Sequence, residues 1–245
     1  MPAQPIRIYL VRHGQSEANL DNAVNARLPD HRVELSPNGK EQAAAVGAHL
    51  AQTLATAQRI RIFCSPYVRA RQTSAAIENA LRSAGIEFDK REAIELRELQ
   101  FGLFDGIADE DLPKRYPDEY GHYEKHKRFQ GEFFAQMPLG ESRCHVADRV
   151  KGVFGTILRD ASSDRAKPVT DFIVVSHGVT IRCFRMQWMH YSWEWYEQEK
   201  NPRNCSVRLI EGRAGAGYAD RLVFDGFETA KPSHQTRREA GQVGG

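Results

Sequence analysis

Short runs of apolar and β-branched residues alternate along the chain with longer segments in which apolar residues recur at helical spacing. Three of the runs, at 6–11, 60–64 and 172–175, have the length and composition of buried parallel strands. A polar turn and then a helical pattern follow each run. This alternation predicts an α/β fold, which we expect to be a three-layer α/β/α sandwich around a mixed, mostly parallel sheet.

The first two helical patterns carry recognisable start and stop signals. Helices are predicted over 37–55 and 66–84, each with a proline at its first position and a serine, Ser36 or Ser65, placed to act as the N-cap. Gly85 follows the apolar stripe of the second helix and is predicted to end it.

The pattern changes between residues 101 and 134, where eight of the chain's 20 Phe and Tyr occur among acidic and basic residues. An even spread would place about three there, so we expect a helical insertion over the active site, at about 101–140. A pair of strands, near 205–210 and 218–224, completes the predicted sheet.

Length, charge and cysteine usage narrow the possible classes of protein. With 245 residues, 41% of them hydrophobic, we expect one domain over 1–227 followed by a flexible tail over 228–245. The net charge of +2 argues against a dedicated nucleic-acid binder, and no apolar run reaches membrane length. Four dispersed cysteines suggest neither a disulfide framework nor a zinc site, and the first residues lack a secretory pattern. We therefore expect a cytoplasmic protein that binds neither nucleic acid nor membrane.

Polar clusters follow three of the predicted strands at the point where each strand ends. Arg12 and His13 come after the first strand, Ser65 and Arg69 after the second, and His177 after the third. Because the carboxyl ends of parallel strands share one edge of a sheet, where ligands bind, we expect these side chains to converge. Guanidinium groups suit the oxygens of a phosphoryl group, and an imidazole nitrogen can attack its phosphorus.

These clusters belong to a series of blocks that resembles the histidine phosphatase superfamily, in the branch that includes cofactor-dependent phosphoglycerate mutases and fructose-2,6-bisphosphatase. One block alone is a weak signal, but the series keeps its order from about residue 6 to residue 207. The blocks are Arg12-His13-Gly14-Gln15-Ser16-Glu17-Ala18-Asn19, Leu35-Ser36-Pro37-Asn38-Gly39 with Gln42-Ala43, Ser65-Pro66-Tyr67-Val68-Arg69-Ala70 with Gln72-Thr73, Leu96-Arg97-Glu98 with Phe101-Gly102 and Asp105-Gly106, Gly140-Glu141-Ser142, and Ser176-His177-Gly178.

The resemblance implies a role for each catalytic candidate. His13 is the nucleophile that becomes phosphohistidine, while Arg12, Arg69 and His177 bind the phosphoryl oxygens and stabilise charge in the transition state. Glu98 falls on the family's general acid, which protonates the leaving oxygen and then, as a carboxylate, activates water. For these roles His13 must be neutral, and Glu98 must be protonated near neutral pH, which requires a raised pKa.

Glu98 depends more on the resemblance than the other residues do. By local pattern alone, Glu92, Glu95 and Glu98 fit a solvated helical face, and Glu95 is an equal candidate for the acid. Only the spacing to Phe101-Gly102 and Asp105-Gly106, as in the family, selects Glu98.

The resemblance also implies further contacts to the substrate, and neither a metal nor a cofactor. The candidate substrate-binding residues are Arg12, Gln15, Ser16, Asn19, Arg69 and Gly178. His122 and His126 are spaced to chelate a metal on a helix, but the stretch that contains them is not H-E-x-x-H and its charges predict a solvated helix face.

Three functions follow from the resemblance. We expect a phosphatase that acts on a small phosphorylated metabolite, because Asp109-Glu110-Asp111 is acidic where a mutase requires cations for a second phosphate. The alternatives are a mutase-type phosphotransferase of the phosphoglycerate mutase kind, and a docking member of the superfamily without activity. If the protein forms an oligomer, a dimer is the expected state.

Overall fold

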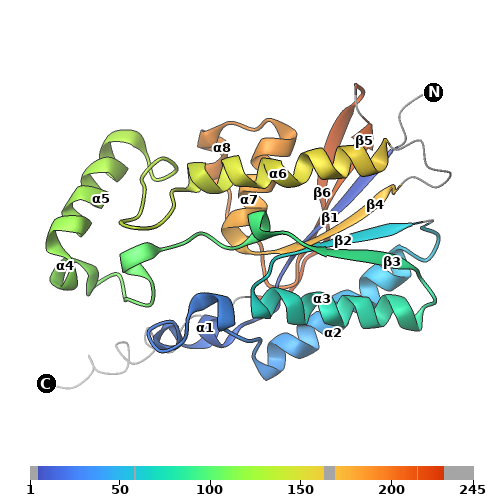
Figure 1. Cartoon of the computed structure of the whole chain (residues 1–245), viewed down its shortest axis with the longest axis horizontal. Helices are drawn as coiled ribbons and strands as arrows, with labels where there is room; N and C mark the ends of the chain where they lie inside the picture. The colour runs from blue at the N-terminus through green and yellow to red at the C-terminus, as the bar shows by residue number, and fades with distance from the viewer. Residues whose placement is uncertain (1–4, 58, 163–168, 214, 229–245) are drawn as a thin grey trace, which may run out of the picture.

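Six strands form one mixed sheet in the order β3-β2-β4-β1-β5-β6 (Figure 1). The computed structural model describes residues 5–57, 59–162, 169–213 and 215–228. The strands are β1 Ile6–Arg12, β2 Ile60–Cys64, β3 Phe88–Glu92, β4 Asp171–Ser176, β5 Val207–Arg213 and β6 Gly217–Phe224. Strands β3, β2, β4 and β1 pair in parallel, whereas β5 is antiparallel to β1 and β6 is antiparallel to β5. The mixed, mostly parallel sheet predicted from the sequence is therefore confirmed.

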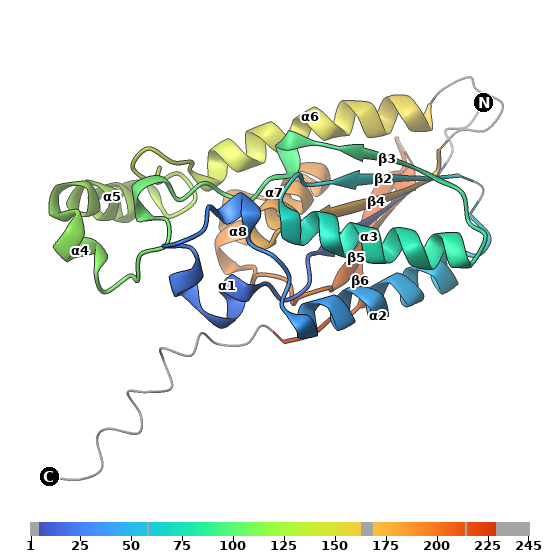
Figure 2. The same cartoon turned by 60° about the horizontal axis from the view of Figure 1, so that its bottom comes forward.

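Helices cover both faces of this sheet (Figure 2). The helices are α1 Glu17–Leu20, α2 Pro37–Thr53, α3 Val68–Ser83, α4 Leu112–Arg115, α5 Pro117–Gln130, α6 Arg143–Ala161, α7 Gly178–Met189 and α8 Trp193–Gln198, with short 3₁₀ turns at η1 Asn22–Val24, η2 Asp30–Arg32, η3 Ile94–Leu96 and η4 Gly102–Phe104. Helices α2 and α3 lie on one face, and α6 and α7 lie on the other (Figures 1 and 2). None of the helices in the described segments is long and apolar enough to cross a bilayer.

The alternation of side chains along β1 explains why the sheet needs both helical layers. Ile8 and Leu10 pack into the buried cluster formed with α6 and α7, while Tyr9 and Val11 pack into the cluster formed with α2 and α3. Successive side chains of a strand point to opposite faces, so a strand that is apolar at every position must be covered twice. The three-layer arrangement is confirmed.

Of the three residues predicted to cap or end these helices, Ser36 and Gly85 are confirmed. Ser36 caps α2, because its Oγ accepts a hydrogen bond from the Gly39 N–H at 3.0 Å. Gly85 lies just beyond the end of α3 with φ +71, a conformation that favours glycine. The prediction for Ser65 was wrong, because α3 begins at Val68 with Tyr67 as its N-cap residue. Ser65 instead pairs with a histidine of the site described below.

Strand β3 was not predicted, because its sequence lacks an apolar pattern. Phe88–Glu92 is mostly exposed and pairs only with β2, at one edge of the sheet. Backbone hydrogen bonds to β2 define this strand, and backbone hydrogen bonds do not require a pattern of apolar and polar side chains. The predicted final pair of strands is present as β5 and β6, and Cys205, at φ +56, precedes β5 instead of belonging to it.

Helices α4 and α5 lie at one end of the molecule, beyond the end of the sheet (Figures 1 and 2). Both belong to the segment predicted as a helical insertion, and residues of both line the main cavity of the protein. The predicted flexible tail, apart from residue 228, lies outside the described residues.

Candidate active site

The register of the parallel strands brings the two candidate histidines together. Arg12 at the end of β1 is level with Ser176 at the end of β4, and the His13 N–H donates to the Ser176 carbonyl at 2.9 Å. The next residues, His13 and His177, have ring centroids 5.1 Å apart and are almost completely buried. Residues 164 positions apart in sequence thus form one site because two strands end at the same edge.

His13 is held as a neutral imidazole with a defined tautomer. Its Nδ1 lies 2.7 Å from the Gly14 carbonyl oxygen, which can only accept, so Nδ1 carries the proton and Nε2 keeps its lone pair. The Arg69 Nε–H points at this Nε2 from 3.3 Å. Burial, followed by the charges of Arg69 and Arg12, holds the pKa of His13 well below its ordinary value of 6.5. A neutral imidazole whose Nε2 carries a lone pair and no proton has the form that a nucleophile needs.

His177 is oriented by the serine that was predicted to cap α3. The Ser65 Oγ lies 2.8 Å from His177 Nε2 and accepts from the Tyr67 N–H at 3.3 Å, so this hydrogen bond fixes the orientation of the imidazole. The other ring nitrogen, Nδ1, is a buried atom without a hydrogen-bond partner among the described residues. His177 is fully buried beside His13 and is not among the residues that line the cavity described below.

Two arginines enter the site from different elements. Arg12 ends β1 and donates to the Pro202 carbonyl at 2.6 Å. Arg69, in the first turn of α3, donates to the Asp30 carbonyl at 2.6 Å and pairs with its carboxylate at 2.8 Å. Asp30 therefore orients the Arg69 fork, and this role was not predicted because an isolated Asp in a polar loop gives no spacing signal.

Ser16 and Asn19 lie on the wall of the same cavity. The Asn19 Oδ1 accepts from the Ser16 N–H at 3.0 Å and from Asn204 Nδ2 at 3.4 Å, so the NH₂ end of Asn19 is the donor left for a ligand. Asn204 also donates to the His13 carbonyl at 3.1 Å, which ties this loop to the histidine.

Gln15 and Gly178, both predicted to bind substrate, are not among the residues that line the cavity. The Gln15 Oε1 accepts from Ser36 Oγ at 2.9 Å and from Asn38 Nδ2 at 3.2 Å, so its side chain holds the start of α2. Gly178 opens α7, and a Cβ there would meet the side chain of Asn201. In this structure Gln15 therefore holds the start of α2, and Gly178 packs closely against Asn201.

The structure distinguishes Glu98 from Glu95, which local pattern left equivalent. Glu98 lines the cavity with His13, whereas Glu95 lies in η3 and faces Gly152 of α6. Burial raises the pKa of the Glu98 carboxyl above its ordinary value and outweighs the lowering by the Leu99 N–H and by Arg69. The predicted solvated helical face is absent, because Glu92 ends β3, Glu95 lies in a single 3₁₀ turn and Glu98 has no regular secondary structure.

The cavity has a volume of about 520 Å³ and is divided by chemistry. The two arginines, His13 and Asn19 form its cationic end. The remaining walls are mixed. Their apolar and aromatic part is formed by Phe101, Phe104, Ile107, Leu112, Tyr120, Tyr123 and Met137, and their charged part by Asp105, Asp109, Glu124, Lys127, Glu132 and Arg143. The charged end suits a phosphoryl group, and the apolar walls suit the body of an ester.

His122 and His126 lie on the exposed side of α5. Across the part of the chain that the structure describes, no group of three or more His, Cys, Asp or Glu side chains is arranged to hold a metal ion.

Comparison with known proteins agrees with this geometry. The family model of the histidine phosphatase superfamily (branch 1) matches residues 8–224. A phosphoglycerate mutase-like protein of Arabidopsis thaliana is 34% identical over 230 residues, which cover 88% of this chain and 67% of that protein. A broad-range acid phosphatase of Saccharomyces cerevisiae is 26% identical, over 85% of this chain and 86% of that protein.

Solved structures share the fold at lower identity. A mycobacterial glucosyl-3-phosphoglycerate phosphatase superposes with a TM-score of 0.65 at 20% identity, over 93% of this chain and all of that one. The alpha-ribazole phosphatase of Shigella flexneri superposes with a TM-score of 0.66 at 17% identity, over 92% of this chain and 98% of that one.

The neutral state of His13 predicts how stability depends on pH. Because the pKa of His13 is lower in the folded chain than in the unfolded chain, acid favours unfolding as pH falls below about 6.5. In His13→Gln the fall in unfolding free energy between pH 6 and pH 5 should be smaller by up to about 1.4 kcal/mol per pH unit. Urea unfolding at several pH values measures both slopes. Loss of the exposed imidazole in His122→Gln should leave the wild-type slope, and equal slopes in His13→Gln would contradict the buried neutral state.

Proposed function

The chain belongs to the histidine phosphatase superfamily, and from this premise we propose that it is a phosphatase that hydrolyses small phosphomonoesters through a phosphohistidine at His13. One observation carries the proposal. A neutral imidazole whose Nε2 keeps its lone pair and a carboxyl group with a raised pKa line the same cavity, at the end that holds the two arginines. A nucleophile requires the neutral imidazole, and a raised pKa favours the protonated carboxyl that a general acid requires.

In the first step the Nε2 lone pair of His13 attacks phosphorus and a P–N bond forms. The P–O bond to the alcohol breaks, and the leaving oxygen takes the proton of Glu98. Arg12, Arg69 and His177 stabilise the charge on the three phosphoryl oxygens. The Nδ1–H of His13 keeps its hydrogen bond to the Gly14 carbonyl, and this bond stabilises the positive charge of the phosphorylated ring.

In the second step water attacks the phosphorus of the phosphohistidine. The Glu98 carboxylate takes a proton from this water, and the P–N bond breaks. Inorganic phosphate leaves, and both His13 and Glu98 return to their initial protonation states. The same carboxyl group therefore acts first as an acid and then as a base.

The charges around the cavity support hydrolysis over phosphate transfer to a second phosphorylated substrate. Asp105 and Asp109 line the walls beyond the phosphoryl end. The two cations in these walls are compensated by carboxylates. Lys127 Nζ lies 3.7 Å from a carboxylate oxygen of Glu124, and Arg143 forms an ion pair with Glu132. A mutase of bisphosphates needs uncompensated positive charge for its second phosphate. The apolar walls favour a substrate with a less charged body.

A single-turnover experiment tests the nucleophile. Wild-type protein mixed with a ³²P-labelled phosphomonoester should acquire a label that is acid-labile and base-stable, as expected for a phosphoramidate. His13→Ala should lose the label and at least about 10³-fold of the turnover. An acid-stable label, or turnover retained in the variant, would remove His13 from this role.

The fate of the label separates a phosphatase from a mutase. We expect the phosphoenzyme to decay to free phosphate without an acceptor, because Glu98 can deprotonate water. With 3-phosphoglycerate as substrate, formation of 2-phosphoglycerate should be negligible, with or without 2,3-bisphosphoglycerate. The mutase alternative matches the name of the mutase-like relatives. Interconversion of the two phosphoglycerates that depends on the bisphosphate and is faster than phosphate release would establish it.

Leaving groups test the general acid. Phenolate needs a proton and p-nitrophenolate does not, so Glu98→Gln should lower kcat on phenyl phosphate by about 10²-fold or more and on p-nitrophenyl phosphate far less. The rate on phenyl phosphate should fall as pH rises through the raised pKa of Glu98, and the variant should lack this fall. Glu95→Gln is the matched control and should behave as wild type. Equal sensitivity of the two variants would refute the assignment.

A further inference from the structure

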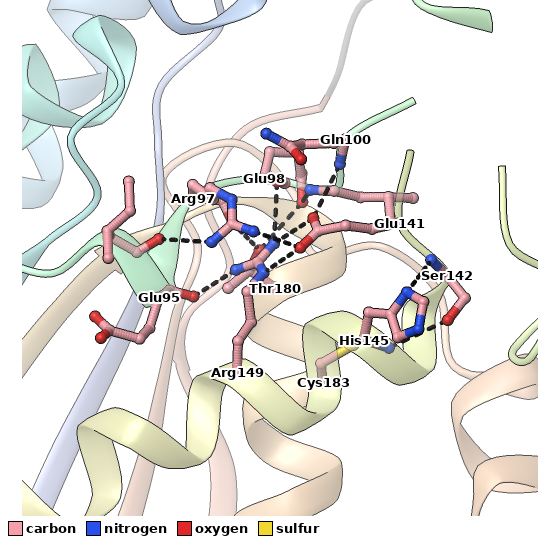
Figure 3. A network of polar contacts seen from close by, with 12 residues as sticks. Glu95, Arg97, Glu98, Gln100, Glu141, Ser142, His145, Arg149, Thr180 and Cys183 are labelled. Atoms are coloured by element: carbon pink, nitrogen blue, oxygen red, sulfur yellow. Dashed lines mark hydrogen bonds and ion pairs between the residues drawn. The ribbon is translucent and has the colours of Figure 1, made fainter. Parts of the chain in front are cut away.

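A buried carboxylate, Glu141, lies behind the general acid and outside the cavity (Figure 3). Its Oε1 accepts from Arg97 at 2.6 Å and from the Arg149 Nε at 2.9 Å. Its Oε2 accepts from the second branch of Arg149 at 3.1 Å and from the Gln100 N–H at 3.1 Å. Both oxygens are thus saturated by donors that come from two separate segments of the chain.

Glu141 and Arg149 hold the main chain on both sides of Glu98. Arg149 donates to the carbonyls of Glu95 and Glu98, the latter at 3.0 Å. The backbone N–H of Glu141 donates to the Gln100 carbonyl at 2.9 Å. Arg149 comes from α6, so a rigid helix supplies the anchor for this segment.

The segment needs such an anchor because Glu98 lies in neither a helix nor a strand. The 3₁₀ turn η3 ends at Leu96, and residues 98–101 have no regular secondary structure. On the other side, Thr180 of α7 donates to the Arg97 carbonyl at 2.7 Å, and its Oγ1 lies 3.2 Å from Glu98 Oε1. Side chains from α6 and α7 therefore fix the main chain around Glu98, as backbone hydrogen bonds would inside a helix.

Energetics favours a positional role over a stabilising one. A buried ion pair gains little net stability, since desolvation offsets its attraction, but the planar fork of arginine fixes direction through two parallel hydrogen bonds. Glu141 and Arg149 do not line the cavity, so they contact no substrate and act through the main chain. A general acid displaced by about 1 Å can lose about 10²-fold in rate.

We propose that Glu141 and Arg149 are positioning residues that hold Glu98 in reach of the leaving oxygen. The proposal rests on the proposed function, because it gives Glu98 the role of general acid. The pair sets the geometry of proton transfer and takes no part in attack by His13. Its loss is therefore felt only by substrates whose leaving oxygen needs the proton.

The test substitutes Glu141→Gln, which keeps the size of the side chain but replaces one acceptor oxygen with an NH₂ group that faces arginine donors. We expect kcat on phenyl phosphate to fall by about 10- to 100-fold, and kcat on p-nitrophenyl phosphate by less than about 3-fold. KM should be unchanged for both. In the double variant with Glu98→Gln, the loss on phenyl phosphate should not exceed that of Glu98→Gln alone, because both changes remove one function.

Glu78→Gln is the matched control. Its side chain is 10% exposed, as that of Glu141 is, and it pairs with Lys90 at 2.6 Å and Arg82 at 3.3 Å away from the cavity. This variant should keep the wild-type ratio of the two rates. Arg149→Lys is the second variant, for use if Glu141→Gln does not fold. It keeps the positive charge but loses the planar guanidinium fork. It should show the same loss on phenyl phosphate and little loss on p-nitrophenyl phosphate.

The outcomes separate this proposal from the proposed function. A wild-type protein without a phosphohistidine at His13 would defeat the function itself. The positioning role alone would be overturned by the following combination. The wild-type protein is labelled at His13 and Glu98→Gln shows its selective defect, but Glu141→Gln and Arg149→Lys lose equal activity on both substrates. The positioning role would also be overturned if the losses of Glu141→Gln and Glu98→Gln on phenyl phosphate were additive in the double variant.

Discussion

The parallel pairing of β1, β4 and β2 is the constraint on which the site depends. Arg12 is level with Ser176, and Cys64 is level with Val175, so three strands end at one edge and the residues that follow them meet there. A shift of register by one residue would turn these side chains to the opposite face of the sheet. The two buried layers of helices prevent such a shift, because every position of β1 between Ile8 and Val11 is packed.

Burial divides the titratable groups of the site into two kinds. It lowers the pKa of His13, where Arg12 and Arg69 act in the same direction, and it raises the pKa of Glu98 against the pull of Arg69. The same low-polarity surroundings thus favour a neutral base and a protonated acid, which is the pairing that acid–base chemistry at pH 7 requires. Asp30 balances the charge of Arg69 and fixes the direction of its fork.

Chemistry and substrate choice belong to different parts of the molecule. The edge of the sheet holds the phosphoryl end of the cavity, while Leu112 of α4 and Tyr120 and Tyr123 of α5 contribute to its apolar wall. Both helices lie beyond the end of the sheet (Figure 1). The irregular segment that carries Glu98 joins the two parts and is held by charges from α6. In a superfamily that retains the phosphoryl site, variation in the wall can change the ester without a change in the reaction.

The sequence by itself determined the elements and the chemistry at their ends. Apolar runs identified β1, β2 and β4, Ser36 and Gly85 marked helix ends, and the ordered blocks identified the family. These signals are local, because strand periodicity, caps and turns depend on neighbours in the chain. Only the tertiary structure decided that Ser65 contacts His177, that the Gln15 side chain holds the start of α2, and that Glu98 and not Glu95 lines the cavity. It alone revealed β3, Asp30 and the pair Glu141 and Arg149. Each of these depends on a partner that is remote in sequence, and no local pattern of polarity specifies which remote group a buried polar side chain will meet.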